Sequence, residues 1–84
     1  MSNKHRRTLG QLFEIPPLSS IQWKDVQGLL VFLGATIKKG KGSRIRFVLN
    51  GVRATFHRPH PRKEMDKGAV LSMRRFLTNG GIKP

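Results

Sequence analysis

The dipeptide Asn50-Gly51 constrains the fold of this chain more than any other feature, because it predicts a tight β-hairpin turn. A two-residue type I′ turn needs a positive φ at both central positions, and asparagine and glycine tolerate that conformation. Counting outward from the turn gives one register, in which Arg44 faces His57 across the two strands. The expected hairpin therefore spans residues 44 to 57.

Alternation along the two strands gives this hairpin one apolar face and one polar face. The apolar face collects Ile45, Phe47, Leu49, Val52, Ala54 and Phe56. The opposite face carries Arg44, Arg46, Val48, Arg53, Thr55 and His57. A slip of one residue would exchange the two faces, so the pattern specifies the register strongly. We expect the apolar face to be covered and the cationic face to be open.

The charge of the chain points to a polyanionic partner. Lysine and arginine number 17 against 4 acidic residues, a formal net charge of +13 in 84 residues. Nucleic acid is the first candidate, a membrane surface is the second, and an acidic protein partner is compatible with either. The absence of cysteine excludes disulfides and thiolate metal sites. The longest apolar run, residues 29–33, is too short to span a bilayer, and no apolar signal core is present, so we expect a soluble cytoplasmic protein.

Apolar spacing predicts two helices around three strands. The first helix runs over residues 23–33 and ends at Gly34, and the second begins after Asp66 as its N-cap and runs to about Thr78. Residues 35–38 alternate as a first strand. Residues 21–84 are thus expected to form an α+β domain of order α-β-β-β-α, in which both helices cover one face of a three-stranded antiparallel sheet.

Residues 1–20 are expected to form an extra basic arm. Asn3 could cap a short helix within it, and Pro16-Pro17 ends any such helix at about Ile15. Its apolar positions are Leu9, Leu12 and Phe13. Partial packing on the domain is favoured over an extended arm that would follow a phosphate backbone with its basic residues.

The loop over residues 39–43 alternates lysine and glycine before a serine, as a phosphate cradle does. It lacks the spacing of a nucleotide-binding P-loop, and a strand follows it instead of a helix, so an NTPase is not expected. Backbone N–H groups with Lys39 and Lys41 could contact a nucleic-acid phosphate, and a flexible hairpin loop is the alternative.

The order of these elements, with three short motifs, resembles the HicA toxin family. The motifs are Gly42-Ser43 before the second strand, His60-Pro61 after the third, and Lys-Gly-Ala-Val-Leu-Ser over residues 67–72. The resemblance covers about residues 23–82. It implies a double-stranded-RNA-binding-domain-like fold and a messenger-RNA-cleaving ribonuclease, or mRNA interferase. It also implies a HicB-type antitoxin as the neutralising partner in a type II toxin-antitoxin module.

The chain departs from the family at one position. A catalytic histidine usually follows the Gly-Ser pair, where this chain has Arg44, and arginine cannot accept a proton at physiological pH. The Gly-Ser-Arg sequence with His-x-Pro-His-Pro over residues 57–61 is similar to one branch of the family. His57, the expected cross-strand neighbour of Arg44, would bring an imidazole close to the family's catalytic position.

These residues suggest roles in metal-independent RNA cleavage, which needs a base, an acid and cations that stabilise the phosphorane. His57 is the candidate base or acid, and His60 is either the second proton-transfer group or a structural turn residue. The predicted RNA- or phosphate-binding residues are Lys39, Lys41, Ser43, Arg44, Arg46, Arg53 and Arg58. No metal-ligand spacing is present, and no cofactor is expected. The alternative is a non-catalytic RNA-binding module of the same fold, in which His57 is an ordinary surface residue.

Overall fold

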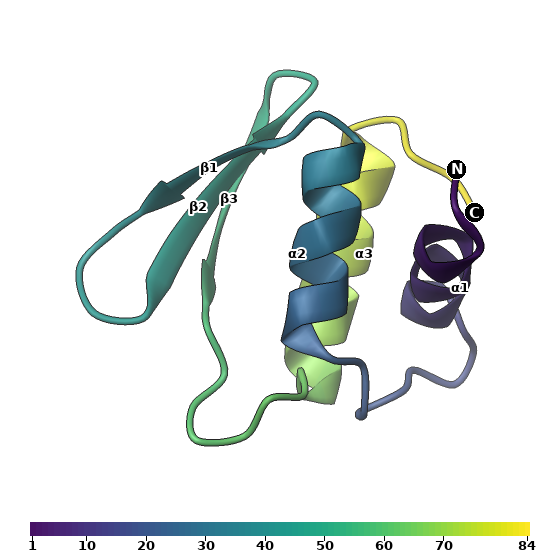
Figure 1. Cartoon of the computed structure of the whole chain (residues 1–84), viewed down its shortest axis with the longest axis horizontal. Helices are drawn as coiled ribbons and strands as arrows, with labels where there is room; N and C mark the ends of the chain where they lie inside the picture. Colours follow the sequence, from purple (N-terminus) through teal and green to yellow (C-terminus); the bar gives the residue numbers. More distant parts are fainter.

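The computed structural model describes residues 1–84 and arranges them in three layers (Figure 1). The elements are α1 (Asn3–Leu12), α2 (Trp23–Phe32), β1 (Thr36–Lys39), β2 (Arg44–Leu49), β3 (Val52–His57) and α3 (Lys67–Asn79). The three strands form one antiparallel sheet in the order β1-β2-β3. Helices α2 and α3 lie between this sheet and α1 (Figure 1). From α2 onward the chain has the predicted α-β-β-β-α order of a double-stranded-RNA-binding-domain-like α+β fold. No helix is both long and apolar enough to cross a bilayer.

The predicted hairpin register is confirmed at every pair from Leu49 with Val52 to Arg44 with His57. Asn50 and Gly51 both have positive φ, 51° and 82°, as the tight turn requires. The Asn50 side chain also donates a 2.7 Å hydrogen bond from Nδ2 to the carbonyl of Gly80. The hairpin tip is therefore joined to the end of α3.

The apolar face of the sheet is covered by α2 and α3, as predicted. Phe47 in β2 is fully buried and lies at the centre of this layer. Its ring centroid lies 5.9 Å from that of Trp23 in α2, 5.9 Å from that of Phe56 in β3 and 6.4 Å from that of Phe76 in α3. Trp23 is only 7% exposed, so it is a core residue and not an open stacking platform.

The ends of α2 and α3 follow from the local sequence, and the first strand begins one residue later than predicted. Gly34 has a φ of 92° and ends α2, as predicted. The next residue, Ala35, donates its backbone N–H to the carbonyl of Leu30 at 2.9 Å, so it belongs to the C-terminal motif of the helix and β1 begins one residue later than expected. Asp66 is confirmed as the N-cap of α3, since its Oδ1 accepts from the Ala69 N–H at 2.7 Å.

Helix α1 packs on the domain, as favoured, but its ends differ from the prediction. Ser2 and not Asn3 is the N-cap, because the Ser2 hydroxyl accepts the His5 N–H at 3.2 Å. The helix ends at Leu12, before the two prolines. Leu9 and Leu12 join the main hydrophobic core, and Phe13 is half-buried against it.

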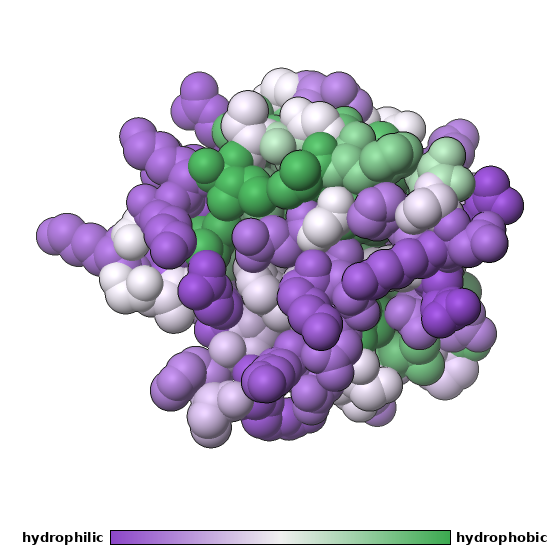
Figure 2. All heavy atoms as spheres, viewed as in Figure 1, coloured by the Kyte–Doolittle hydropathy of each residue, from purple (hydrophilic) through white to green (hydrophobic).

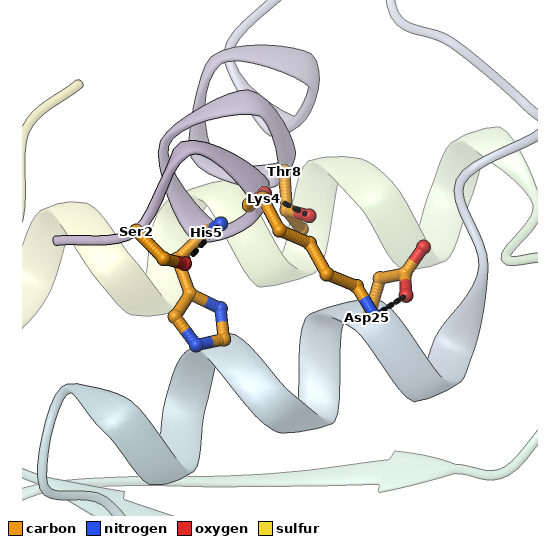
Figure 3. A network of polar contacts seen from close by, with 5 residues as sticks. All are labelled: Ser2, Lys4, His5, Thr8 and Asp25. Carbon is orange, nitrogen blue, oxygen red and sulfur yellow. Dashed lines mark hydrogen bonds and ion pairs between the residues drawn. The ribbon is translucent and has the colours of Figure 1, made fainter.

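A polar contact and an aromatic contact join α1 to α2, and Figure 3 shows the polar contact between Lys4 and Asp25. Lys4 Nζ lies 3.3 Å from Asp25 Oδ1, and the His5 ring stacks on Phe32 at a centroid distance of 4.9 Å. A Cβ added at Gly28 would lie 3.7 Å from His5 Cε1, so the imidazole packs closely over this glycine. His5 thus has a packing role between the two helices.

Candidate functional site

The face of the sheet that no helix covers holds a continuous group of cations. Arg44, Arg46 and Arg53 are all exposed on it, because the confirmed register directs their side chains away from the core. Strand β1 adds Lys38, which pairs with Arg46. We call this surface the open face and define it by Lys38, Arg44, Arg46, Arg53, Thr55 and His57.

A hollow of about 340 Å³ lies at the end of the open face, where the loop between β1 and β2 curves over it. Its lining residues are Lys38, Lys39, Gly40, Lys41, Arg44, Arg46 and Thr55. None of them is acidic or apolar. The one ion pair of the chain joins Lys4 and Asp25 near α1, so no carboxylate lies within 4.0 Å of any cation in the hollow. An anionic ligand would meet positive charge that no protein group neutralises.

His57 does not line this hollow but is the cross-strand neighbour of Arg44, which does, and it lies beside the Gly-Ser motif. It is the last residue of β3 and pairs with Arg44, the first residue of β2. Its Nδ1 lies 3.4 Å from the Ser43 hydroxyl oxygen. The Arg58 N–H donates to the Ser43 carbonyl at 2.8 Å, so backbone pairing continues one step past His57 and fixes Ser43 beside the imidazole. With Nδ1 directed at Ser43, Nε2 is the ring nitrogen left for a ligand.

A second histidine lines a hollow together with His57. His60 is exposed in the segment between β3 and α3, and the two histidines contribute to the same cavity wall. The two acidic residues of this wall, Glu64 and Asp66, have structural roles. Asp66 caps α3, and Glu64 pairs through its backbone with Gln22. No three His, Asp or Glu side chains anywhere in the chain are grouped closely enough to hold a metal ion.

The structure separates two of the predicted phosphate ligands from the open face. Lys39 pairs with Ile45, so its register places it toward the helix side, although it still borders the cationic hollow. Arg58 follows His57 and projects to the opposite side, where it lines a hollow with Trp23. The remaining predicted residues, Lys41, Ser43, Arg44, Arg46 and Arg53, lie at the open face or its loop.

Lys38 belongs to this site but was missed as a candidate in the sequence. It is exposed and pairs with Arg46, and it lines both the hollow described above and a second hollow that it shares with Arg46 and Arg53. The signal was present, since residues 35–38 alternate as a strand and the polar positions of a strand share one face. The register of β1 against β2 could not be predicted from the sequence, because the four-residue loop between them fixes it less tightly than a two-residue turn.

Comparison with known proteins gives one match. The family model described as HicA toxin of bacterial toxin-antitoxin matches residues 23–80, from the start of α2 to the end of α3. The match contains the whole sheet and both helices that cover it, and α1 lies outside it. Searches of curated proteins and of solved structures gave no match.

Proposed function

Because the chain belongs to the HicA toxin family of bacterial toxin-antitoxin systems, we propose that it is a metal-independent endoribonuclease that cleaves messenger RNA in the cytoplasm. The observation that supports this activity best is the group formed by Ser43, Arg44 and His57 on the open face. It places an accessible imidazole beside unneutralised cations, which is what the cleavage of a phosphodiester next to a 2′-hydroxyl requires.

In the proposed reaction the RNA supplies its own nucleophile. The 2′-oxygen bonds to the adjacent phosphorus, the bond from phosphorus to the 5′-oxygen breaks, and the products are a 2′,3′-cyclic phosphate and a 5′-hydroxyl. A base takes the proton of the 2′-hydroxyl, and an acid gives a proton to the leaving 5′-oxygen. His57, through Nε2, takes one of these roles. His60, which lines the same hollow, takes the other.

The cations of the open face hold the phosphate and stabilise the charge that grows on it. Arg44 stands directly across the strand pair from His57, and Arg46 and Lys38 continue the positive surface along the sheet. A planar guanidinium donates two parallel hydrogen bonds to two phosphate oxygens, so Arg44 suits this role although it cannot transfer a proton. In this proposal Arg44 is the phosphate clamp at the position where the family usually has its catalytic histidine.

Ser43 is a positioning residue in this scheme. A hydroxyl 3.4 Å from Nδ1 restricts rotation of the imidazole, and it directs Nε2 outward to the substrate. Replacement of Ser43 by alanine would leave both proton-transfer groups in place but let the ring rotate. We expect a lower kcat with little change in KM for S43A, since the phosphate cations are untouched.

The proposed protein partner is a HicB-type antitoxin with an acidic contact surface. A toxin with a net charge of +13 and an open cationic face offers a large electrostatic target for such a partner. An antitoxin that covers the open face would exclude RNA from the same residues. Neutralisation would then need no change of conformation in the toxin.

The decisive test is cleavage of single-stranded RNA by the purified chain in excess EDTA. Wild type is expected to cut, and His57→Ala should lose a factor of about 100 to 10,000 in kcat, the usual contribution of a general acid or base. Arg53→Ala is the matched control, because Arg53 shares the open face but is four residues away from His57 along β3. It should weaken binding far more than it lowers kcat. Equal cleavage by wild type and His57→Ala would remove the catalytic assignment.

The same experiment distinguishes the non-catalytic alternative. If wild type binds RNA with a steep salt dependence but leaves it intact over a range of sequences, the chain is an RNA-binding module. His57→Ala would then affect binding no more than the loss of one arginine.

A further inference from the structure

A second cationic hollow lies on the other side of the β3 end and is not part of the open face. It is lined by Gln22, Trp23, Lys24, Arg58, Pro59 and Lys63. Its floor is formed by half-buried Pro59 and by the small exposed edge of Trp23, and three cationic residues line it without a single acidic lining residue. Hydrophilic side chains cover the lower part of the molecule in Figure 2, over the segment between β3 and α3. Below we call this hollow the Arg58 groove.

Backbone contacts build the Arg58 groove. The Trp23 N–H donates to the carbonyl of Lys63 at 2.9 Å, and the Met65 N–H donates to the carbonyl of Ile21 at 2.9 Å. These two bonds hold the segment after β3 against the start of α2, so Lys24 and Lys63 line the same hollow. The cations are therefore brought together by the fold and are not scattered on one mobile loop.

Arg58 connects the groove to the histidines. It lines the cavity wall that contains His57 and His60, and it also lines the hollow beside Trp23. Its backbone is fixed by the 2.8 Å hydrogen bond to Ser43. Consecutive residues of an extended chain are about 3.8 Å apart and face opposite ways, so a ligand that leaves the His57 side meets Arg58 next.

The lining of the groove matches the parts of one nucleotide. Cations bind a phosphate, the apolar floor of Pro59 and the edge of Trp23 can contact a nucleobase, and amide groups can hydrogen-bond to the edge of that nucleobase. A neighbouring hollow on α2 adds Gln27. The Gln27 Oε1 already accepts the Trp23 Nε1–H at 3.0 Å, so its NH₂ group is the part left to donate to a ligand.

We infer that the Arg58 groove is a second nucleotide subsite, which binds the single-stranded RNA on one side of the scissile phosphate while the open face binds the other side. This inference rests on the proposed ribonuclease function and adds to it the path of the substrate. The strand crosses the end of β3 at Arg58 instead of running only along the sheet. A substrate fills both the open face and the Arg58 groove only if it is longer than the dinucleotide that the cleavage reaction itself requires.

The test compares two lengths of a probe that cannot be cleaved. Fluorescein-labelled 2′-O-methyl oligouridylates of 4 and 8 nucleotides have no free 2′-hydroxyl to attack the phosphate, so binding is measured by anisotropy without turnover. Wild type should bind the 8-mer roughly tenfold more tightly than the 4-mer, the effect of one further bound nucleotide, or about 1.4 kcal/mol. R58Q/K63Q should lose most of this gain and keep the 4-mer affinity. Its slope of log K against log salt for the 8-mer should fall by about 1.4, two phosphate contacts on single-stranded nucleic acid.

A matched control removes the same charge elsewhere. Arg75 and Lys83 are exposed and line none of the hollows described above, so R75Q/K83Q has the same net charge as R58Q/K63Q. It should keep the 8-mer preference. Equal losses in the two double variants, or equal losses of R58Q/K63Q on both probe lengths, would overturn the inference.

The outcome also separates this inference from the proposed function. Wild type that binds the 4-mer and cleaves unmodified RNA, but gains nothing from four further nucleotides, would refute the groove alone. Wild type that neither binds the probes nor cleaves RNA would refute the ribonuclease and the groove together.

Discussion

Arg74 offers the sharpest test of how α1 is joined to the rest of the chain. Its Nε donates to the carbonyl of Leu12 and its Nη2 to the carbonyl of Glu14, both at 2.7 Å, and its guanidinium lies 5.7 Å from the centre of the Phe13 ring. These are carbonyls at the end of α1 that no helical N–H can satisfy. One side chain of α3 thus caps a helix about 60 residues away in the sequence.

We expect Arg74→Ala to lower the free energy of unfolding by about 2 to 3 kcal/mol. A hydrogen bond from a charged group contributes about 1.5 to 3 kcal/mol when it is shielded from water, and the half-buried bond to Leu12 fits this range. The bond to Glu14 is exposed, so we assign it less than 1 kcal/mol. The contact with Phe13 contributes about 0.5 to 1 kcal/mol, and because the three contacts share one guanidinium group their contributions are not additive, so the total stays at about 2 to 3 kcal/mol. For a chain of this size the loss corresponds to a fall in Tm of roughly 10 to 20 °C.

The neighbouring residue provides the control. Arg75 is exposed and makes no side-chain hydrogen bond, so Arg75→Ala removes the same charge and should change the free energy of unfolding by less than about 0.5 kcal/mol. Urea titrations followed by the fluorescence of Trp23 would compare the two variants, and Trp23 lies on the helix that contacts α1. If both variants unfold at the same urea concentration, α1 is not held by Arg74 and the reasoning is wrong.

Substitutions at three further positions test local features of the fold by the same titration. Asn50→Gly keeps the positive φ but loses the bond to Gly80, so it should lower the free energy of unfolding by about 1 kcal/mol. Asn50→Ala should lower it by about 1 kcal/mol more, because alanine is strained at a positive φ. A glycine variant as stable as wild type would show that the bond contributes nothing. Gly28→Ala should stabilise by up to about 1 kcal/mol, because the new methyl meets His5 at an ordinary contact distance, and a lower Tm would show that the imidazole cannot adapt. Asp66→Ala should cost about 1 kcal/mol through the lost cap, whereas Asp66→Asn should retain most of the stability.

The parts of the fold that sequence predicted correctly are those that local chemistry decides. The register of the hairpin follows from a turn of two residues and a strict alternation, and Asp66 and Gly34 mark helix ends through their own backbone preferences. No long-range information was needed for any of them. The family resemblance named from the motifs was confirmed by the match over residues 23–80.

The parts that sequence predicted poorly depend on a contact between distant residues or on a choice between two equally suitable neighbours. The end of α1 at Leu12 reflects capping by Arg74, and no pattern within the first 20 residues indicates that partner. Ser2 and Asn3 are both good N-caps, so propensity could not choose between them. Arg58 was predicted as a phosphate-binding residue, and its position directly after His57 in an extended segment implies the side opposite to the open face. The roles assigned to His57 and His60 stay predictions until the variants are assayed.

The position of α1 has a practical consequence for work with this protein. Both chain termini lie on the α1 side of the molecule, with the helix pair between them and the sheet (Figure 1). An affinity tag or fluorescent protein attached at either end therefore starts on the far side from His57, and it should leave RNA access intact. An antitoxin fused to either terminus also starts on the far side of the molecule from the open face that it has to cover. The molecule measures 31 × 28 × 20 Å, so a tether that carries an inhibitor around it to the open face needs at least about ten extended residues. Fusions with a shorter tether should remain active as toxins, and fusions with a longer tether should be inhibited by their own antitoxin.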